Sequence, residues 1–176
     1  MQTIYDLLKG HDLRSIGKAN EVVELVTSDP ELFDEVFDGI FHKDKIICAR
    51  CADAVEKVSG RFPEYIQKKK KIILSNLSSF KQKEVRWHIA KMLGYLKLTS
   101  RERELAVRYL FDWLKLDKSI IVKVMSMQTL ADIAKTDKKL LKTVLDEIQK
   151  QMINGAPAIK ARGKKLLNIL KQKEIK

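Results

Sequence analysis

The apolar pattern of this sequence repeats every 37 to 38 residues, and this period constrains the fold more than any other feature of the chain. Within each copy, the repeated positions fall at i, i+4, i+8 and i+11, a spacing that places them on one face of a helix. One helix pair cannot bury such a face alone, whereas a stack of pairs shares one core, so a period of this size is typical of stacked helical pairs. Such proteins bind partners more often than they catalyse reactions, and no residue set in this chain specifies a partner. The aligned columns are Ile47, Val85, Val122 and Ile159; Cys51, Ile89, Ser126 and Gly163; Val55, Leu93, Leu130 and Leu167; and Val58, Leu96, Ile133 and Leu170.

Length and composition agree with one soluble all-α domain. The chain has 176 residues, of which only 7 are Gly and 3 are Pro, and no apolar run approaches the roughly 18 residues of a membrane-spanning helix. The first ten residues lack a basic leader, and the two cysteines form no disulfide framework. We therefore expect a cytoplasmic protein with no membrane association.

Local signals divide the chain into helices joined by short turns. Thr99 and Glu102 have the spacing of a capping box, and Pro63 stands at the expected first position of a helix. Further capping signals are Asp29, Asp44, Asp117 and Thr136, and Asn154-Gly155 marks a turn. The predicted helices are 12–27, 31–41, 45–59, 63–79, 82–97, 100–115, 118–134, 137–152 and 157–172, with a weak one near 3–9.

Residues inside the repeat resemble a known family. The segment 85–96 begins with Val-Arg and ends with Leu-Gly-Tyr-Leu. This resembles the first-helix pattern of HEAT repeats, which has Val-Arg, a pair of small residues and then Leu-Gly-x-Leu. The segment 47–55 is similar, and Asp117 and Lys123 stand six residues apart like the Asp and Arg that form a ladder between HEAT repeats. Cys48 departs from the pattern, because it replaces a basic residue.

The resemblance covers about residues 44–172 and implies an all-α fold, a right-handed α-α superhelix, or solenoid, of HEAT-like helical pairs. We expect one domain over 1–176. Its parts are divergent acidic N-terminal capping helices in 1–42, three helix pairs in 43–153 and an unpaired C-terminal capping helix in 154–176. In the family, the second helices line the concave surface, which implies the same place for 63–79, 100–115 and 137–152.

Charge is distributed unevenly along the chain. Residues 1–42 carry a net charge of −6, whereas residues 43–176 carry +18. A basic body favours polyanionic partners, and cations along successive second helices would match a phosphate backbone. The alternative is a surface that only keeps the protein soluble, since Glu104, Asp112 and Asp146 lie in the same rows. The candidate polyanion-binding residues are Lys68, Lys71, Arg101, Arg108, Lys115, Lys139 and Lys142.

Aromatic residues in these rows offer a second interpretation. Tyr109 and Trp113 are candidates for stacking on nucleic-acid bases, while packing in the core is the competing explanation. HEAT-like repeats also occur in alkylpurine DNA glycosylases, whose concave face holds tryptophans and an aspartate, and Asp112 beside Trp113 is similar to that arrangement.

No other residue pattern points to catalysis. Cys48 and Cys51 form a C-x-x-C motif, but zinc needs about four ligands and this pair supplies two. The three histidines have no nucleophile or carboxylate at a recurring spacing, and no phosphate-binding glycine loop is present. We expect no enzymatic activity, no cofactor, no metal and no small-molecule substrate.

The segment 31–41 carries more apolar residues than one buried stripe requires. Phe33 and Phe37 are therefore candidates for an apolar partner surface, unless the segment 3–9 covers them. Taken together, the sequence predicts a non-catalytic scaffold that recognises a macromolecule, with a protein as the first candidate. A nucleic acid bound along the basic face is the alternative, and a HEAT-like DNA glycosylase is the alternative from another class.

Overall fold

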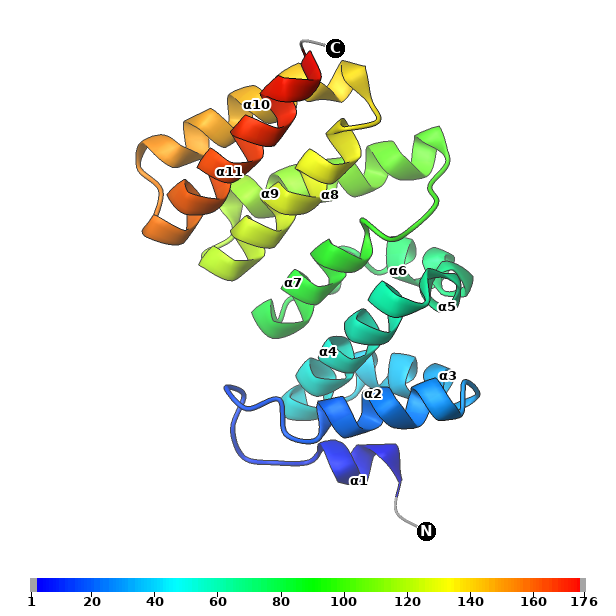
Figure 1. The fold of residues 1–176 in the computed structure, drawn as a ribbon. Helices are drawn as coiled ribbons and strands as arrows, with labels where there is room; N and C mark the ends of the chain where they lie inside the picture. Colours follow the sequence, from blue (N-terminus) through cyan, green and yellow to red (C-terminus); the bar gives the residue numbers. More distant parts are fainter. Residues whose placement is uncertain (1–2, 175–176) are drawn as a thin grey trace. The chain divides into compact units, whose positions relative to one another are not determined.

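The computed structural model describes residues 3–174, which form 11 α-helices and one short 3-10 turn, with no strand among them (Figure 1). The predicted all-α class is confirmed. By contact, the chain divides into two compact units, unit 1 (Met1–Lys97) and unit 2 (Leu98–Lys176). Unit 1 contains α1 (Ile4–Leu8), α2 (Ala19–Ser28), α3 (Leu32–Asp38), the 3-10 turn (Gly39–Phe41), α4 (Lys45–Arg61), α5 (Pro63–Lys68), α6 (Lys70–Ser75) and α7 (Lys83–Met92). Unit 2 contains α8 (Ser100–Leu116), α9 (Ile120–Ala134), α10 (Lys138–Ile153) and α11 (Pro157–Glu174).

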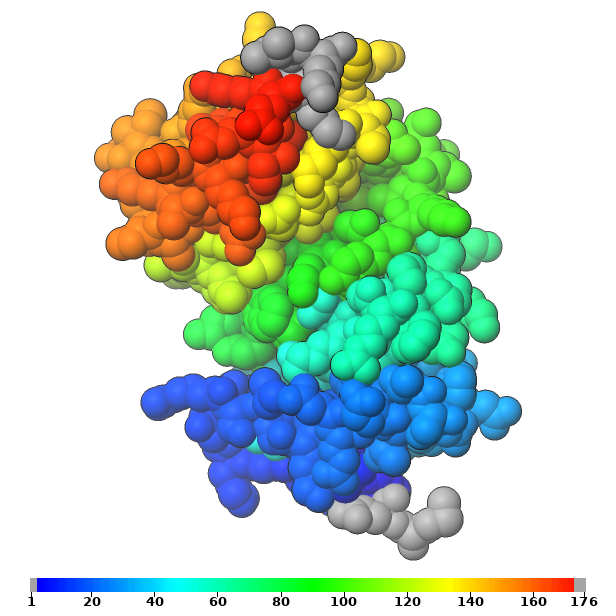
Figure 2. All heavy atoms as spheres, in the orientation of Figure 1, coloured from blue at the N-terminus to red at the C-terminus, as the bar shows by residue number. Residues whose placement is uncertain are grey.

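Each unit has one central helix. In unit 1, α4 packs against α2 on one side and α7 on the other, and also contacts α1, α3 and α5. In unit 2, α9 packs against α8, α10 and α11, while α10 and α11 pack against each other. In the space-filling view, α11, coloured red, has one side open to solvent (Figure 2).

The repeated apolar columns form the core of both units. All sixteen aligned positions are buried except Ile133 and Leu167, which are half-buried. The period found in the sequence is therefore a period of buried positions on α4, on α7 and the turns that follow it, on α9 and on α11.

The helix predicted over 12–27 begins only at Ala19, and Arg50 is the physical reason. The Arg50 side chain is buried, and its guanidinium donates hydrogen bonds to the carbonyl oxygens of Leu8 at 2.9 Å and Lys9 at 2.6 Å. It also donates to the carbonyls of Asp12 and Ser15. These carbonyls must stay outside a helix to meet one guanidinium, so 9–18 wraps around Arg50 as a loop. Gly17, with φ +52°, lies against the guanidinium, where a Cβ would collide with it.

Two further predicted helices of unit 1 are shorter than expected. The helix over 63–79 is interrupted at Lys69, whose side chain turns toward α3, pairs with Asp34 at 2.9 Å and covers the Phe37 ring. The helix over 82–97 ends at Met92 and continues as tight turns, in which the amides of Gly94 and Tyr95 bond three residues back.

Of the five predicted capping residues, Thr99 and Asp44 cap helices. Asp29 and Asp117 do not, because Glu31 directly precedes α3 and Ser119 directly precedes α9. Thr99 and Glu102 form the capping box of α8, and the Asp44 side chain accepts hydrogen bonds from the first amides of α4. Thr136 is not a cap, because the next residue, Asp137, accepts from the Lys139 amide at the start of α10, while Thr136 Oγ1 donates back to Ile133. Each confirmed cap satisfies backbone donors that a helix start leaves without partners.

Candidate functional site

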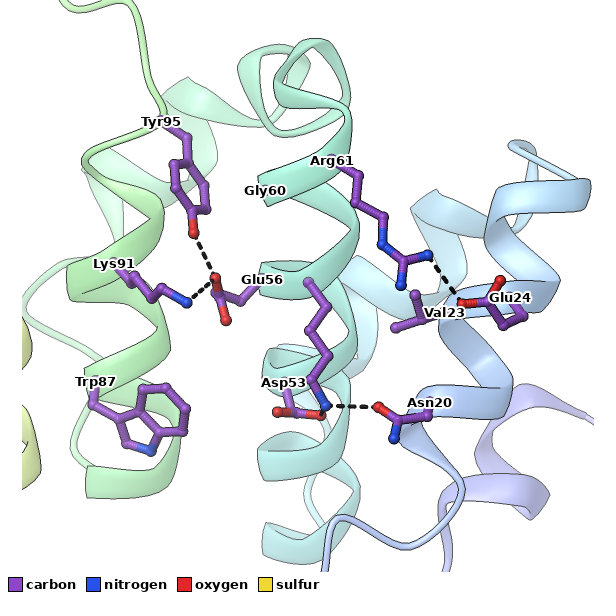
Figure 3. A pocket seen from close by; sticks show the side chains of 11 residues that line it. Asn20, Val23, Glu24, Asp53, Glu56, Gly60, Arg61, Trp87, Lys91 and Tyr95 are labelled. Atoms are coloured by element: carbon purple, nitrogen blue, oxygen red, sulfur yellow. Dashed lines mark hydrogen bonds and ion pairs between the residues drawn. The ribbon is translucent and has the colours of Figure 1, made fainter.

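A groove of about 720 Å³ lies in unit 1 along α2, α4 and α7 (Figure 3). Its charged groups pair across the groove, since Arg61 Nη1 donates to Glu24 Oε1 at 3.0 Å and Lys57 Nζ donates to Asn20 Oδ1 at 2.8 Å. Acids and bases in the lining balance, so the groove has no strong preference for an anion or a cation. The lining residues are Asn20, Val23, Glu24, Asp53, Glu56, Lys57, Gly60, Arg61, Trp87, Lys91 and Tyr95.

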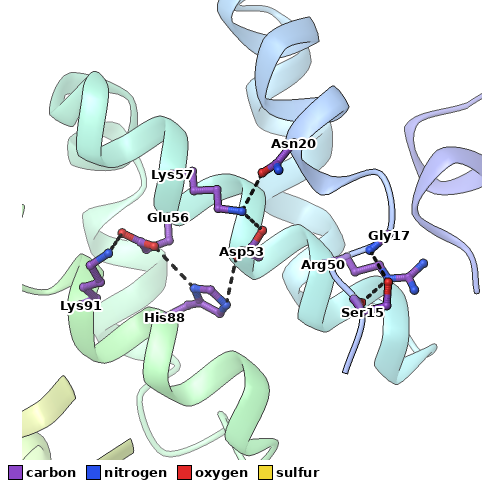
Figure 4. A network of polar contacts seen from close by, with 9 residues as sticks. All are labelled: Ser15, Gly17, Asn20, Arg50, Asp53, Glu56, Lys57, His88 and Lys91. Atoms are coloured by element: carbon purple, nitrogen blue, oxygen red, sulfur yellow. Dashed lines mark hydrogen bonds and ion pairs between the residues drawn. The ribbon is translucent and has the colours of Figure 1, made fainter. Parts of the chain in front are cut away.

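Glu56 organises the α4–α7 side of this groove. The Tyr95 hydroxyl donates to Glu56 Oε1 at 2.6 Å, and Lys91 Nζ lies 2.8 Å from the same oxygen. His88 Nδ1 lies 3.7 Å from the other oxygen, Oε2 (Figure 4). Burial alone would raise the pKa of Glu56, but the contacts with His88, Lys91 and Tyr95 lower that pKa to about 2. The carboxylate therefore stays ionised.

His88 connects Glu56 to a second carboxylate. Its Nε2 lies 3.8 Å from Asp53 Oδ1, and Lys57 Nζ lies 2.6 Å from the other Asp53 oxygen. Burial lowers the pKa of His88 below its ordinary value, in spite of the two carboxylates, which act in the opposite direction. The His88 imidazole is only 3% exposed, so its contacts with Asp53 and Glu56 hold α7 against α4.

All seven predicted polyanion-binding residues are exposed. Lys68 and Lys71 lie in unit 1, on the two short helices α5 and α6. Lys115, on α8, is partly neutralised by the buried Glu147 of α10 at 3.7 Å. The four remaining cations lie in unit 2 and are Arg101, Arg108, Lys139 and Lys142.

Of the two predicted base-stacking residues, only Tyr109 is partly exposed. Trp113 is buried, so the expectation that it stacks on a base is corrected in favour of packing in the core. Tyr109 is half-buried, with its ring 6.1 Å from that of Trp113 and the Arg108 guanidinium 5.5 Å above it. Asp112 is exposed on α8, away from any buried pocket formed with Trp113.

Phe33 and Phe37 do not form an exposed surface. Their side chains are 3% and 0% exposed, because Tyr65 packs on Phe33 and Phe41 packs on Phe37. The expectation of an apolar partner surface at these two residues is therefore wrong. The segment 31–41 has additional apolar residues because α3 is covered by the α5 side of the unit as well as by α4.

The two cysteines are buried and protonated. Burial raises the pKa of both thiols, and Cys48 Sγ donates to the His42 carbonyl at 2.6 Å. Within residues 3–174, no group of three or more His, Cys, Asp and Glu side chains is placed to hold a metal ion. In the same range, no helix is both long and apolar enough to cross a membrane.

The polar clusters around Arg50 and Glu56 were not predicted from the sequence. The sequence does contain a signal for such contacts, because several polar side chains that meet in the structure are one repeat period apart in sequence. Lys57 meets Asn20 and Arg61 meets Glu24, both 37 residues earlier.

Comparison of the chain with protein-family models, with curated proteins and with solved structures found no match.

Proposed function

We propose that this protein is a non-catalytic binding module made of HEAT-like helical pairs that stack as a right-handed solenoid. A column of side chains that reach the preceding repeat supports the stacking. Arg50, His88 and Arg162 occupy the same repeat position, directly before the buried second column, and the third copy has Met125 there. His88 faces Asp53, and Arg162 Nη1 donates to Gln128 Oε1 at 2.9 Å. Asp53 and Gln128 are themselves equivalent positions, as expected of a ladder between neighbouring repeats within each unit.

We further propose that the partner is a polyanionic macromolecule. The observation that carries this proposal is an imbalance between buried acids and exposed bases. Asp53, Glu56 and Glu147 are buried and paired within the fold, so their negative charge is not available at the surface. Of the seven predicted cations, all but Lys115 form no ion pair within the described residues. The net charge of +12 is therefore concentrated in accessible side chains.

The burial of Phe33 and Phe37 removes the feature that favoured an apolar protein partner. The catalytic alternative gains no support either, because Trp113 is buried and the buried carboxylates are engaged in inter-helix contacts. Binding of a polyanion is then the function that the surface chemistry favours.

Fluorescence anisotropy with a labelled 25-base-pair duplex tests this function. We expect micromolar or tighter binding at 50 mM salt, with affinity that falls steeply toward 200 mM as counterions compete. A peptide nucleic acid duplex of the same sequence, which has no phosphates, is the matched control and should not bind. Absence of binding to DNA, RNA and heparin at 50 mM salt would reject a polyanionic partner.

A further inference from the structure

Unit 2 carries exposed lysines on α10 and α11, of which the second-helix pattern singled out only Lys139 and Lys142. We propose that the face shared by α10 and α11 holds the phosphate backbone of duplex nucleic acid without reading its bases. This inference rests on the proposed polyanion-binding function and assigns it to one surface, which we call the α10–α11 lysine face. Its members are the exposed lysines Lys138, Lys142, Lys160, Lys164 and Lys171.

The packing of α11 determines which of its sides is free. Gly163 lies against Met152 of α10, and Arg162 reaches Gln128 of α9, so these two directions are occupied by protein. A rotation of about 60° to 100° around the helix axis separates Gly163 from three lysines, Lys160, Lys164 and Lys171. This rotation places them on the side of α11 opposite Arg162. All three are exposed.

The lysines of α10 turn to the same side. Met152 is the α10 residue that contacts Gly163 of α11, so it lies on the side of α10 that faces α11. Around the axis of α10, Lys138 and Lys142 are rotated from Met152 by less than about 90°. A link of three residues, 154–156, joins the two helices, which run antiparallel (Figure 1). Because the helices are antiparallel, rotation in the same sense around each one brings both sets of lysines to the same outer face of the pair.

The charge of this face is nearly undiluted. The sequence has no Asp or Glu from 148 to 173, and Asp146 of α10 borders the face. Within the described residues, none of the five lysines forms an ion pair. This contrasts with the outer row of α8, where Glu104 and Asp112 alternate with the bases.

The composition of the face selects among polyanions. No aromatic residue follows Trp113 in the sequence, and binding of single strands depends on aromatic side chains that stack on bases. Helices that bind membrane surfaces insert a row of large apolar side chains. On this face only Ile153, at the end of α10, is large, apolar and strongly exposed, and the exposed side of α11 carries lysines with Ala161 and Asn168. Lysine is a flexible point charge that suits phosphates without fixed geometry. These properties favour the regular backbone of a duplex.

The length of the face and its number of lysines predict how many base pairs it covers and how steeply its affinity falls with salt. From Lys160 to Lys171 the helix rises about 16 Å, which corresponds to roughly five base pairs of duplex. Five lysine–phosphate contacts predict a log–log salt slope of about −4.5.

The test compares two charge-matched variants of the full chain. The triple variant Lys160→Glu, Lys164→Glu, Lys171→Glu changes the proposed face. The control variant Lys43→Glu, Lys81→Glu, Lys97→Glu makes the same change in net charge at exposed lysines of unit 1 that are not among the predicted polyanion-binding residues. We expect the first to weaken duplex binding at least about 30-fold at 50 mM salt and to reduce the slope to about −2, and the second to change affinity less than about threefold. Circular dichroism and thermal unfolding verify that both variants fold.

Several outcomes would overturn the inference while leaving the general function in place. These are equal losses in both variants, a loss only in the control, or tighter binding of a single strand than of a duplex of the same length. Binding to vesicles with anionic lipid but not to duplex would also reject it. Complete absence of polyanion binding in the unchanged protein would instead reject the proposed function itself.

Discussion

At the scale of single residues, Glu56 shows how a buried charge holds two helices together. It is 4% exposed and receives contacts from Tyr95 and Lys91 of the α7 side. We expect Glu56→Gln to lower the free energy of unfolding by about 1–3 kcal/mol, because one buried hydrogen-bonded charge is lost. Urea denaturation measures this. Glu24→Gln is the control and should cost less than about 0.5 kcal/mol, since both partners of the Arg61–Glu24 pair are largely exposed.

The same carboxylate predicts a pH dependence. The pKa of Glu56 is about 2 in the folded state, against an ordinary value of 4.5. Its stabilisation is therefore complete above pH 4.5 and is lost as the pH falls toward 2, by roughly 3 kcal/mol in total. Between pH 5 and 2.5, the unfolding free energy of Glu56→Gln should fall less steeply than that of the unchanged protein. Parallel curves would contradict this assignment. The lowered pKa of His88 acts in the same direction, and its contribution begins to be lost as the pH falls below 6.5.

At the scale of elements, Thr99 and Thr136 form a matched pair, because both are exposed and both have the sequence of a helix cap. Only Thr99 caps a helix, through the Glu102 amide. We expect Thr99→Ala to destabilise the protein by about 1 kcal/mol and Thr136→Ala by less than about 0.5 kcal/mol. Thermal unfolding of the two variants, measured side by side, tests this. Equal losses would show that the capping box of α8 adds little.

The elements also show which parts of the molecule the sequence can predict. The presence of the helices and the burial of the repeated columns follow from the spacing of apolar residues within each helix. Both predictions are confirmed. The late start of α2 depends on Arg50, whose partners lie up to 42 residues away in sequence. The burial of Phe33 likewise depends on Tyr65, from a helix that the local pattern does not connect to it. Contacts of this kind require the tertiary arrangement, and the Glu56 cluster escaped prediction for the same reason.

At the scale of the whole molecule, most contacts join neighbouring helices. The loss of one contact should therefore destabilise only the helices beside it. Arg50 is satisfied entirely by the loop 9–18 and the end of α1, within unit 1. Arg50→Lys keeps the charge but has too few donors for four carbonyls, so amides of 9–18 and α2 should lose protection from hydrogen exchange.

In the proposed array of stacked repeats, stability would be close to a sum of local terms, so we expect the amides of α9 and α10 to keep their protection in this variant. Hydrogen exchange followed by mass spectrometry compares the two regions in one sample. A uniform loss of protection over both units would mean that they unfold as a single cooperative body, and it would contradict the repeat-array model of stability. Retained protection in unit 2 would also imply that the α10–α11 lysine face stays folded when the N-terminal loop is released. In that case Arg50→Lys should bind duplex with unchanged affinity, which links the folding experiment to the binding one.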